Sequence, residues 1–111
     1  MARKLIMMLS VERQLKMFVI QLHYKAAIEK VDQYLIEHRN FLEAGYQKNY
    51  FIASGPKNPR TGGIILSQLK DQAQLEKCLR EDPFSMHDIA DYEIIEFTPV
   101  KFHADFERFI Q

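Results

Sequence analysis

Apolar and polar positions follow two different periods along the chain. The segment MFVIQLHY, at residues 17–24, alternates large apolar side chains with others, which predicts a strand with one buried face. In residues 26–45 the apolar positions recur every three or four residues, which predicts an amphipathic helix. Gly45 is expected to end this helix, because glycine is favoured just after a helical C-terminus. The apolar stripe of the helix consists of Ile28, Val31, Leu35, His38 and Leu42.

Three more segments have the composition of strands. NYFIASGP at 49–56 and GIILSQL at 63–69 are rich in aromatic and branched residues, and the sequence NPRTGG between them is typical of a turn. DYEIIEFTPVKF, at 91–102, predicts a last strand and its exit. The residues from there to Gln111 carry no clear periodic pattern.

Two helical segments are expected between the last two strands. Asp71, with a glutamine three residues later, resembles a capping box and predicts the start of a helix. Asp82 and Pro83 are favoured at the N-cap and first position of a helix, and predict a short turn or helix to about Ala90. The resulting order is β-α-β-β-α-β. This is the ferredoxin-like arrangement, an α+β fold with both helices on one face of an antiparallel sheet.

The predicted strands carry apolar residues on both faces, whereas two helices cover only one. Successive side chains of a strand point to opposite faces, so the pairs at 51–52, 64–65 and 94–95 each place one apolar group on either side. A large exposed apolar face indicates an interface, because an open antiparallel sheet normally leaves its second face polar. We therefore expect a homodimer whose two sheets pack face to face, as in a dimeric α+β barrel.

Length and composition limit the remaining possibilities. The chain has 111 residues, which suits one domain, and its 15 basic and 15 acidic residues argue against nucleic acid as a partner. Cys78 is the single cysteine and favours a reducing, cytoplasmic location. No apolar run approaches the roughly 20 residues of a membrane helix, so no membrane association is expected. Residues 1–16 are interpreted as an N-terminal extension, and 17–111 as the domain.

Two residues have the chemistry of an acid–base pair. His38 lies on the apolar stripe of the first helix and should point toward the sheet, where a buried polar group needs a partner. Its role is either structural or that of a general acid or base. Asp82 is an expected helix cap, and an ionised carboxylate near His38 would also orient the imidazole ring. Both interpretations are open at this point.

The end of the second strand has the composition of a loop that can meet a ligand. Ser54, Gly55 and Pro56 form either an ordinary turn or a close backbone approach to a bound molecule, which glycine permits. Lys57 and Arg60 beside them are solvated loop charges or attract an anionic substrate. The histidines and the lone cysteine match no metal-ligand spacing, and no phosphate loop, dinucleotide fingerprint or nucleophile elbow occurs. We therefore expect neither a metal nor a cofactor.

Five short segments, in order, resemble the YciI-like, or YCII-related, family over about residues 17–101. These segments are HRNFLEAG, ASGP, GGIILSQ, EDPF and DYEIIEFTP. The resemblance implies a ferredoxin-like domain that forms a dimeric α+β barrel, with an active site that pairs His38 and Asp82. The chain departs from the family at Met86, His87 and Asp88, because many relatives carry a glycine a few residues after the DPF motif.

The resemblance also implies a class of function. We expect a small cofactor-independent enzyme, of lyase, isomerase or dehydrochlorinase type, in which His38 is the base and Asp82 orients it. The alternatives are a non-catalytic ligand-binding module and an accessory dimerisation domain, because a fold does not determine a function. The ligand is expected to be a small anionic or aromatic molecule. The expected substrate-binding residues are Ser54, Gly55, Pro56, Phe84, Phe51 and Tyr50.

Overall fold

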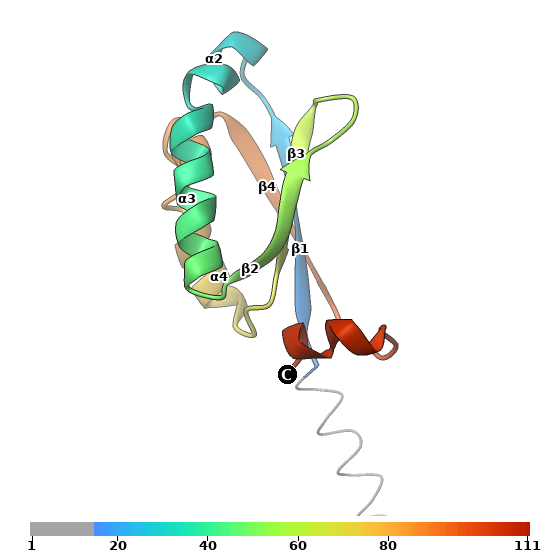
Figure 1. Ribbon diagram of the computed structural model, residues 1–111. Coiled ribbons are helices and arrows are strands. Elements are labelled where there is room, and N and C mark those ends of the chain that lie inside the picture. The colour runs from blue at the N-terminus through green and yellow to red at the C-terminus, as the bar shows by residue number, and fades with distance from the viewer. Residues whose placement is uncertain (1–14) are drawn as a thin grey trace, which may run out of the picture.

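The computed structural model describes residues 15–111 and has an α+β architecture, as predicted (Figure 1). The strands are β1 (Met17–Tyr24), β2 (Phe51–Pro56), β3 (Gly62–Ser67) and β4 (Ala90–Phe97). The helices are α2 (Ile28–Gln33), α3 (Leu35–Gln47), α4 (Gln72–Leu79), α5 (Pro83–Met86) and the 3-10 helix η1 (Ala104–Phe109). Within the described residues, no helix is both long and apolar enough to cross a membrane.

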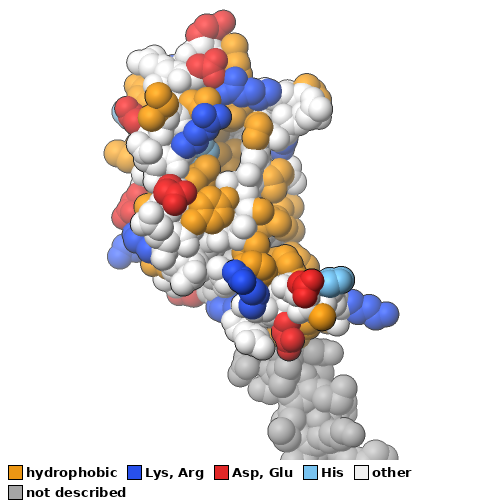
Figure 2. All heavy atoms as spheres, viewed as in Figure 1, with side chains coloured by type: hydrophobic (Ala, Val, Ile, Leu, Met, Phe, Trp, Pro, Cys, Tyr) orange, Lys and Arg blue, Asp and Glu red, His pale blue; other side chains and the backbone are white. Residues whose placement is uncertain are grey.

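The four strands form one antiparallel sheet in the order β2-β3-β1-β4. The register places Ile20 of β1 opposite Ile65 of β3 and Ile94 of β4, so these three side chains share one face. Helices α2 to α5 lie over that face (Figure 1). Seen from the same side, the surface carries scattered acidic and basic side chains, and hydrophobic side chains gather between the helical layer and the strands (Figure 2). This topology is the ferredoxin-like arrangement that the order of elements predicted.

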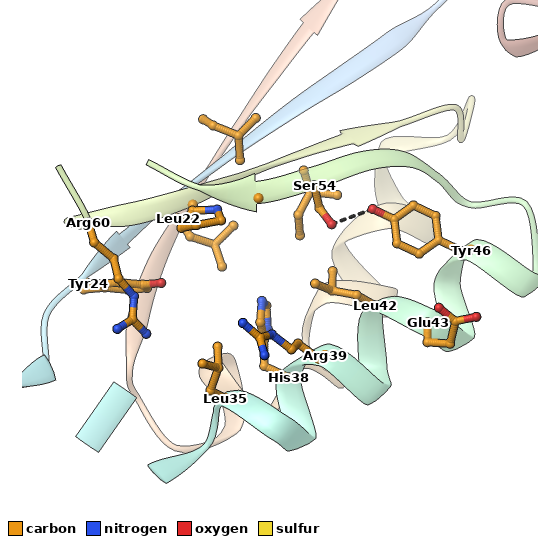
Figure 3. A pocket seen from close by; sticks show the side chains of 15 residues that line it. Leu22, Tyr24, Leu35, His38, Arg39, Leu42, Glu43, Tyr46, Ser54 and Arg60 are labelled. Carbon is orange, nitrogen blue, oxygen red and sulfur yellow. Dashed lines mark hydrogen bonds between the residues drawn. The ribbon is translucent and has the colours of Figure 1, made fainter. Parts of the chain in front are cut away.

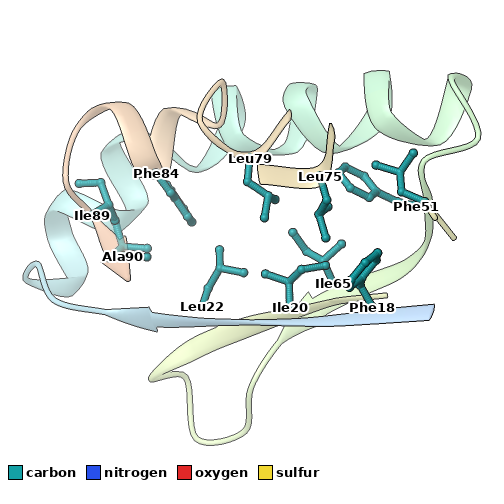
Figure 4. Packing of buried hydrophobic residues seen from close by; sticks show 12 residues of the cluster. Phe18, Ile20, Leu22, Phe51, Ile65, Leu75, Leu79, Phe84, Ile89 and Ala90 are labelled. Atoms are coloured by element: carbon teal, nitrogen blue, oxygen red, sulfur yellow. The ribbon is translucent and has the colours of Figure 1, made fainter. Parts of the chain in front are cut away.

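The hydrophobic core fills the space between the sheet and the helices (Figure 4). Phe18, Ile20 and Leu22 alternate along β1 and are almost completely buried. They face Leu75 and Leu79, which are the buried residues of α4. Burying a side chain of this size contributes roughly 1.5–3 kcal/mol, so the alternation along β1 is sufficient to fix which face of the strand lies inside.

The first helical segment differs from the prediction. The predicted single helix over 26–45 is two helices, α2 and α3, because Tyr34 leaves the helical conformation, with φ −106° and ψ 8°. The prediction that Gly45 ends the helix was wrong, since α3 continues to Gln47. Gly45 instead lies inside α3 where the ring of Phe51 approaches, and a Cβ at this position would overlap that ring. Asn49 supplies the left-handed residue after the helix, with φ 60°.

The other boundaries are close to those predicted. The first strand has the predicted bounds, while β2 begins two residues later, β3 runs from 62 to 67, and β4 ends at Phe97. The side chain of Asp71 accepts a hydrogen bond from the amide of Ala73 at 3.1 Å and caps α4, as predicted. The predicted N-terminal extension falls almost entirely outside the described residues.

The C-terminal residues pack against the start of β1, although their sequence carried no clear pattern. Ile110 and Met17 are only 1% and 2% exposed. The ammonium group of Lys70 joins the two segments, since it donates to the carbonyl oxygens of Lys16 at 2.8 Å and Ile110 at 3.0 Å. Burial, and to a smaller extent the positive charge of Lys16, lowers the pKa of Lys70.

The second face of the sheet carries apolar side chains. Val19 lies opposite Leu66 on one side and Ile95 on the other, and Met17 lies opposite Phe97. Ile95 and Phe97 are 39% and 42% exposed. We call the group Val19, Leu66, Ile95 and Phe97 the outer apolar face, because helices α2 to α5 cover the opposite side of the sheet.

Candidate active site

His38 lies on the inner side of α3 and is only 8% exposed. Its ring stacks on that of Phe84 from α5, with 4.0 Å between the ring centroids and an interplanar angle of 4°. The stacking explains how a polar residue fits the apolar stripe of the helix. The imidazole lies flat against an apolar surface, so only its ring edge needs polar partners.

Asp82 is completely buried and is the N-cap of α5. Its Oδ1 atom accepts hydrogen bonds from the amide of Phe84 at 3.0 Å and from Nδ1 of His38 at 2.8 Å. The same carboxylate therefore caps a helix and contacts the histidine. Asp82 therefore makes both contacts that the sequence suggested, one with the helix that it caps and one with the ring of His38.

Tyr92 is a member of this group that sequence reasoning missed. Its hydroxyl donates to Oδ2 of Asp82 at 2.5 Å. Burial, the negative charge of Asp82 and this hydrogen bond all raise the pKa of Tyr92, so the phenol stays protonated and acts as a donor. The alternation along β4 would have put Tyr92 on the same face as Ile94, which is the only signal that the sequence contained.

The hydrogen bonds of Asp82 define the chemistry of the imidazole ring. A carboxylate oxygen accepts the hydrogen bond from Nδ1, so the neutral imidazole with its proton on Nδ1 has its lone pair on Nε2. Among residues 15–111 no side chain or backbone group forms a hydrogen bond to that Nε2. Nε2 is therefore available for a hydrogen bond to a molecule in the adjoining cavity, which His38 lines.

A cavity of about 700 Å³ lies between α3 and the sheet edge formed by β2 and β3 (Figure 3). Its size is in the range of sites for small organic ligands. His38 lies in its wall, together with the predicted residues Ser54, Gly55 and Pro56. The other lining residues are Leu22, Tyr24, Leu35, Arg39, Leu42, Glu43, Tyr46, Arg60, Gly63, Ile64 and Ile65.

The structure places the three predicted aromatic residues away from the cavity lining. Phe84 is buried behind His38, and Phe51 is buried in the core against Gly45 and the ring of Tyr46. Tyr50 precedes β2, and its carbonyl oxygen accepts a hydrogen bond from the hydroxyl of Ser67 at 2.7 Å. Phe84 thus supports the histidine, whereas Phe51 and Tyr50 lie in the core and at the start of a strand.

The polar groups of the cavity are distributed along its length. The hydroxyls of Tyr46 and Ser54 are 2.5 Å apart at one end (Figure 3). Arg60, from the hairpin between β2 and β3, donates to Asp32 at 2.6 Å, and this carboxylate raises the pKa of the guanidinium. Lys57, by contrast, does not line the cavity, since its ammonium group lies 3.2 Å from Nδ1 of His23 on the other face of the sheet.

The loop after α5 departs from the family pattern in sequence but has a defined local structure. Asp88 adopts the left-handed conformation, with φ 58°, which glycine would adopt without strain. Its carboxylate pairs with Lys25, which also pairs with Asp91 at 3.0 Å. The ring of His87 stacks on that of Tyr34, with centroids 4.1 Å apart. These contacts connect the loop to β1 and to the junction of α2 and α3.

Within the range 15–111, no group of three or more histidine, cysteine, aspartate or glutamate side chains is placed to hold a metal ion.

Comparisons with known proteins agree with this fold. The chain matches the model of the YCII-related domain over residues 15–98. It is similar to the structure of 5-chloro-2-hydroxyhydroquinone dehydrochlorinase from Burkholderia phenoliruptrix in complex with 2,5-dihydroxybenzoquinone. That similarity has a TM-score of 0.60 and 16% identity over 80% of this chain and 96% of that chain.

A second solved structure is a variant of SnoaB, a cofactor-independent oxygenase from Streptomyces nogalater. It gives a TM-score of 0.44 and 12% identity over 80% of this chain and 96% of that chain. Among curated proteins, none matches the chain. At these identities, the structural similarity to the dehydrochlorinase supports the fold, and the function has to be argued from the site itself.

Proposed function

Since the chain belongs to the YCII-related domain family, we propose that it is a cofactor-independent enzyme that moves a proton on a small molecule. In this proposal His38 is the base and Asp82 is its orienting partner. The observation that carries it is the 2.8 Å hydrogen bond between His38 Nδ1 and Asp82 Oδ1, behind a wall of the cavity. A cytoplasmic location, in keeping with the single cysteine, belongs to the same proposal.

The geometry supports a base rather than a nucleophile. Asp82 holds the proton on Nδ1, so that the lone pair of Nε2 accepts a proton from the substrate, and its negative charge then stabilises the imidazolium ion. Phe84 holds the ring plane by stacking, and Tyr92 holds the second carboxylate oxygen. In this proposal both the orientation and the tautomer of the ring are set before a substrate binds.

Two reaction types use such a base without a cofactor. In an elimination, the base removes a proton and a leaving group departs with its bonding electrons, as in the loss of a proton and a chloride that the name of the dehydrochlorinase describes. In an isomerisation, the imidazolium ion returns the proton to a different atom of the same molecule. The proposed substrate is a small anionic or aromatic compound that presents its acidic hydrogen to Nε2 of His38.

We expect the wild-type protein to accelerate proton removal from a suitable small molecule, and the His38→Gln variant to show only the buffer rate. The measurement is chloride release from 5-chloro-2-hydroxyhydroquinone, with deuterium uptake from heavy water by 2,5-dihydroxybenzoquinone as a second assay, followed by NMR. His103→Gln is the matched control, since His103 is exposed and lies beyond the cavity, at the N-cap of η1. Saturable binding of these compounds with no rate above buffer would instead indicate a ligand-binding module.

We further propose that the chain forms a homodimer through the outer apolar face. An apolar face of this kind is stabilised when a second sheet removes it from water. The wild-type protein is expected to have about twice the 13.1 kDa chain mass in light scattering at micromolar concentration. Ile95→Asp should convert it to a monomer, because a carboxylate would be buried without a partner.

The control for this prediction is Ile36→Asp. Ile36 is 73% exposed and belongs to α3, on the helical side of the molecule, so the charge should leave the mass unchanged. A wild-type protein that scatters as a monomer, or an Ile95→Asp variant that remains dimeric, would contradict the proposed interface.

A further inference from the structure

The cavity beside His38 has charged groups of opposite sign at its two ends. Arg39 and Arg60 line it together with His38, and Glu43 follows one helical turn after Arg39. Figure 3 shows Arg60 near Tyr24 at one end, while Glu43 lies toward the other end. The two guanidinium groups offer N–H donors to an anion, whereas Glu43 makes the other end unfavourable for one.

The guanidinium of Arg60 is held by Asp32 and has further N–H donors. Its NH2 atom donates to Asp32 of α2 at 2.6 Å, which ties the β2–β3 hairpin to the helical layer. A guanidinium has five N–H donors in a planar fork, so one such bond leaves most of them unused. Asp32 therefore positions the guanidinium of Arg60 and leaves other N–H donors for a ligand.

Arg39, unlike Arg60, has no acidic partner among the described residues. Within the described part of the chain, its guanidinium forms no ion pair and no hydrogen bond to another side chain, and Glu43 is not within ion-pair distance of it. Arg39 and His38 both belong to α3, and both line the cavity. An anion bound to Arg39 would be next to the proposed site of proton transfer.

The opposite end of the cavity suits a neutral oxygen. The Tyr46 and Ser54 hydroxyls, 2.5 Å apart, contain two O–H groups and can both donate to and accept from a hydroxyl or carbonyl group. Between the two ends the wall is apolar, with Leu35 and Leu42 on α3. A matching ligand has an acidic group at one end, a flat or apolar middle, and a neutral oxygen at the other end.

From this arrangement we infer that the substrate is a small hydroxy- or oxo-substituted carboxylic acid whose carboxylate binds between Arg39 and Arg60. The inference rests on the proposed function, since it concerns the same cavity, and it assigns two binding residues that the acid–base pair does not include. Arginine is well suited to this role, because its planar fork matches the two oxygens of a carboxylate. The carboxylate then places the middle of the substrate against Nε2 of His38.

The test compares 4-hydroxybenzoate with its neutral isostere, 4-hydroxybenzamide, in NMR titrations of the full chain. The wild-type protein is expected to bind the benzoate at least about tenfold more tightly than the benzamide, the size of effect typical of a charge-assisted hydrogen bond. Arg39→Gln and Arg60→Gln should each remove most of that preference and leave the affinity for the benzamide unchanged. Added salt should weaken only the benzoate.

Arg80→Gln is the matched control, since Arg80 is exposed and lies outside this cavity, and it should keep the full preference. Equal affinities for the two compounds in the wild type would overturn the inference. So would equal losses in Arg39→Gln and Arg80→Gln, or no saturable shift with either compound at millimolar concentration. Dispersed NMR spectra of each variant establish that it is folded.

The same titrations separate this inference from the proposed function. A His38→Gln protein that prefers the benzoate but transfers no proton would support both. Turnover of a substrate together with no preference for the benzoate would overturn the carboxylate site alone. A clear preference in a wild-type protein that catalyses no proton transfer would leave the binding site in place and refute the enzyme.

Discussion

Replacing Asp82 by alanine is expected to lower the free energy of unfolding by about 3–6 kcal/mol, a large part of the roughly 5–15 kcal/mol of a typical domain. The reason is that Asp82 accepts from three donors, the His38 ring, the Phe84 amide and the Tyr92 hydroxyl. Alanine would remove the acceptor of all three, and a buried unsatisfied donor costs about 1–3 kcal/mol. The cost for the Tyr92 hydroxyl should lie at the lower end of that range, because Tyr92 is only partly buried. Urea unfolding followed by circular dichroism measures the difference.

The chain contains a matched control for this substitution. Asp71 is also the N-cap aspartate of a helix, but it is exposed, and among residues 15–111 its side chain accepts only from the amide of Ala73. Asp71→Ala should therefore cost about 1 kcal/mol, the usual contribution of a cap. If Asp82→Ala costs no more than Asp71→Ala, then the hydrogen bonds to His38 and Tyr92 contribute nothing to folding, and the buried cluster is not the structural unit described above.

Gly62→Ala is expected to destabilise the protein by about 3–5 kcal/mol, because the structure leaves no space for the new methyl group. A Cβ at Gly62 would overlap the carbonyl oxygen of Leu22 and lie 2.8 Å from its carbonyl carbon. Both atoms belong to the backbone of β1, the strand that pairs with β3 on one side and with β4 on the other. The overlap can only be relieved by moving one strand relative to its neighbour, which disrupts the register on which the core depends.

Gly55→Ala is the control for Gly62→Ala, since a Cβ at Gly55 meets no atom within 4 Å. Its unfolding free energy should stay within about 1 kcal/mol of the wild-type value. Thermal or urea unfolding of both variants provides the comparison. A Gly62→Ala protein as stable as Gly55→Ala would mean that β1 and β3 approach each other less closely at this point than described.

Asp82 connects the stability of the fold with the proposed chemistry. Its carboxylate ends one loop, caps α5 and orients the ring of His38, so any change that weakens the base also weakens the packing around it. For this reason the functional test relies on His38→Gln rather than on a variant of Asp82. Arg39 has no such double role, because it lines the cavity and forms no ion pair within residues 15–111. Arg60 also joins its hairpin to α2 through Asp32.

Local patterns in the sequence were sufficient to predict most of the fold. The alternation in residues 17–24 predicted β1 with its correct bounds, because the period of a strand depends only on the backbone. Asp71 and Asp82 were correctly predicted as helix caps, because a cap is a contact between residues two or three positions apart. The family resemblance added the pairing of His38 with Asp82, which no local pattern contains.

Only the tertiary structure decided what lies between elements that are distant in sequence. Tyr92 reaches Asp82 because the register of β4 and the position of α5 bring the two together. Gly45 lies inside α3 at the point where the ring of Phe51 leaves no room for a side chain. The cavity likewise combines Arg39 of α3 with Arg60 of a hairpin. Periodicity and capping are properties of one segment, whereas these contacts depend on how separate segments pack, which the sequence determines only through the whole fold.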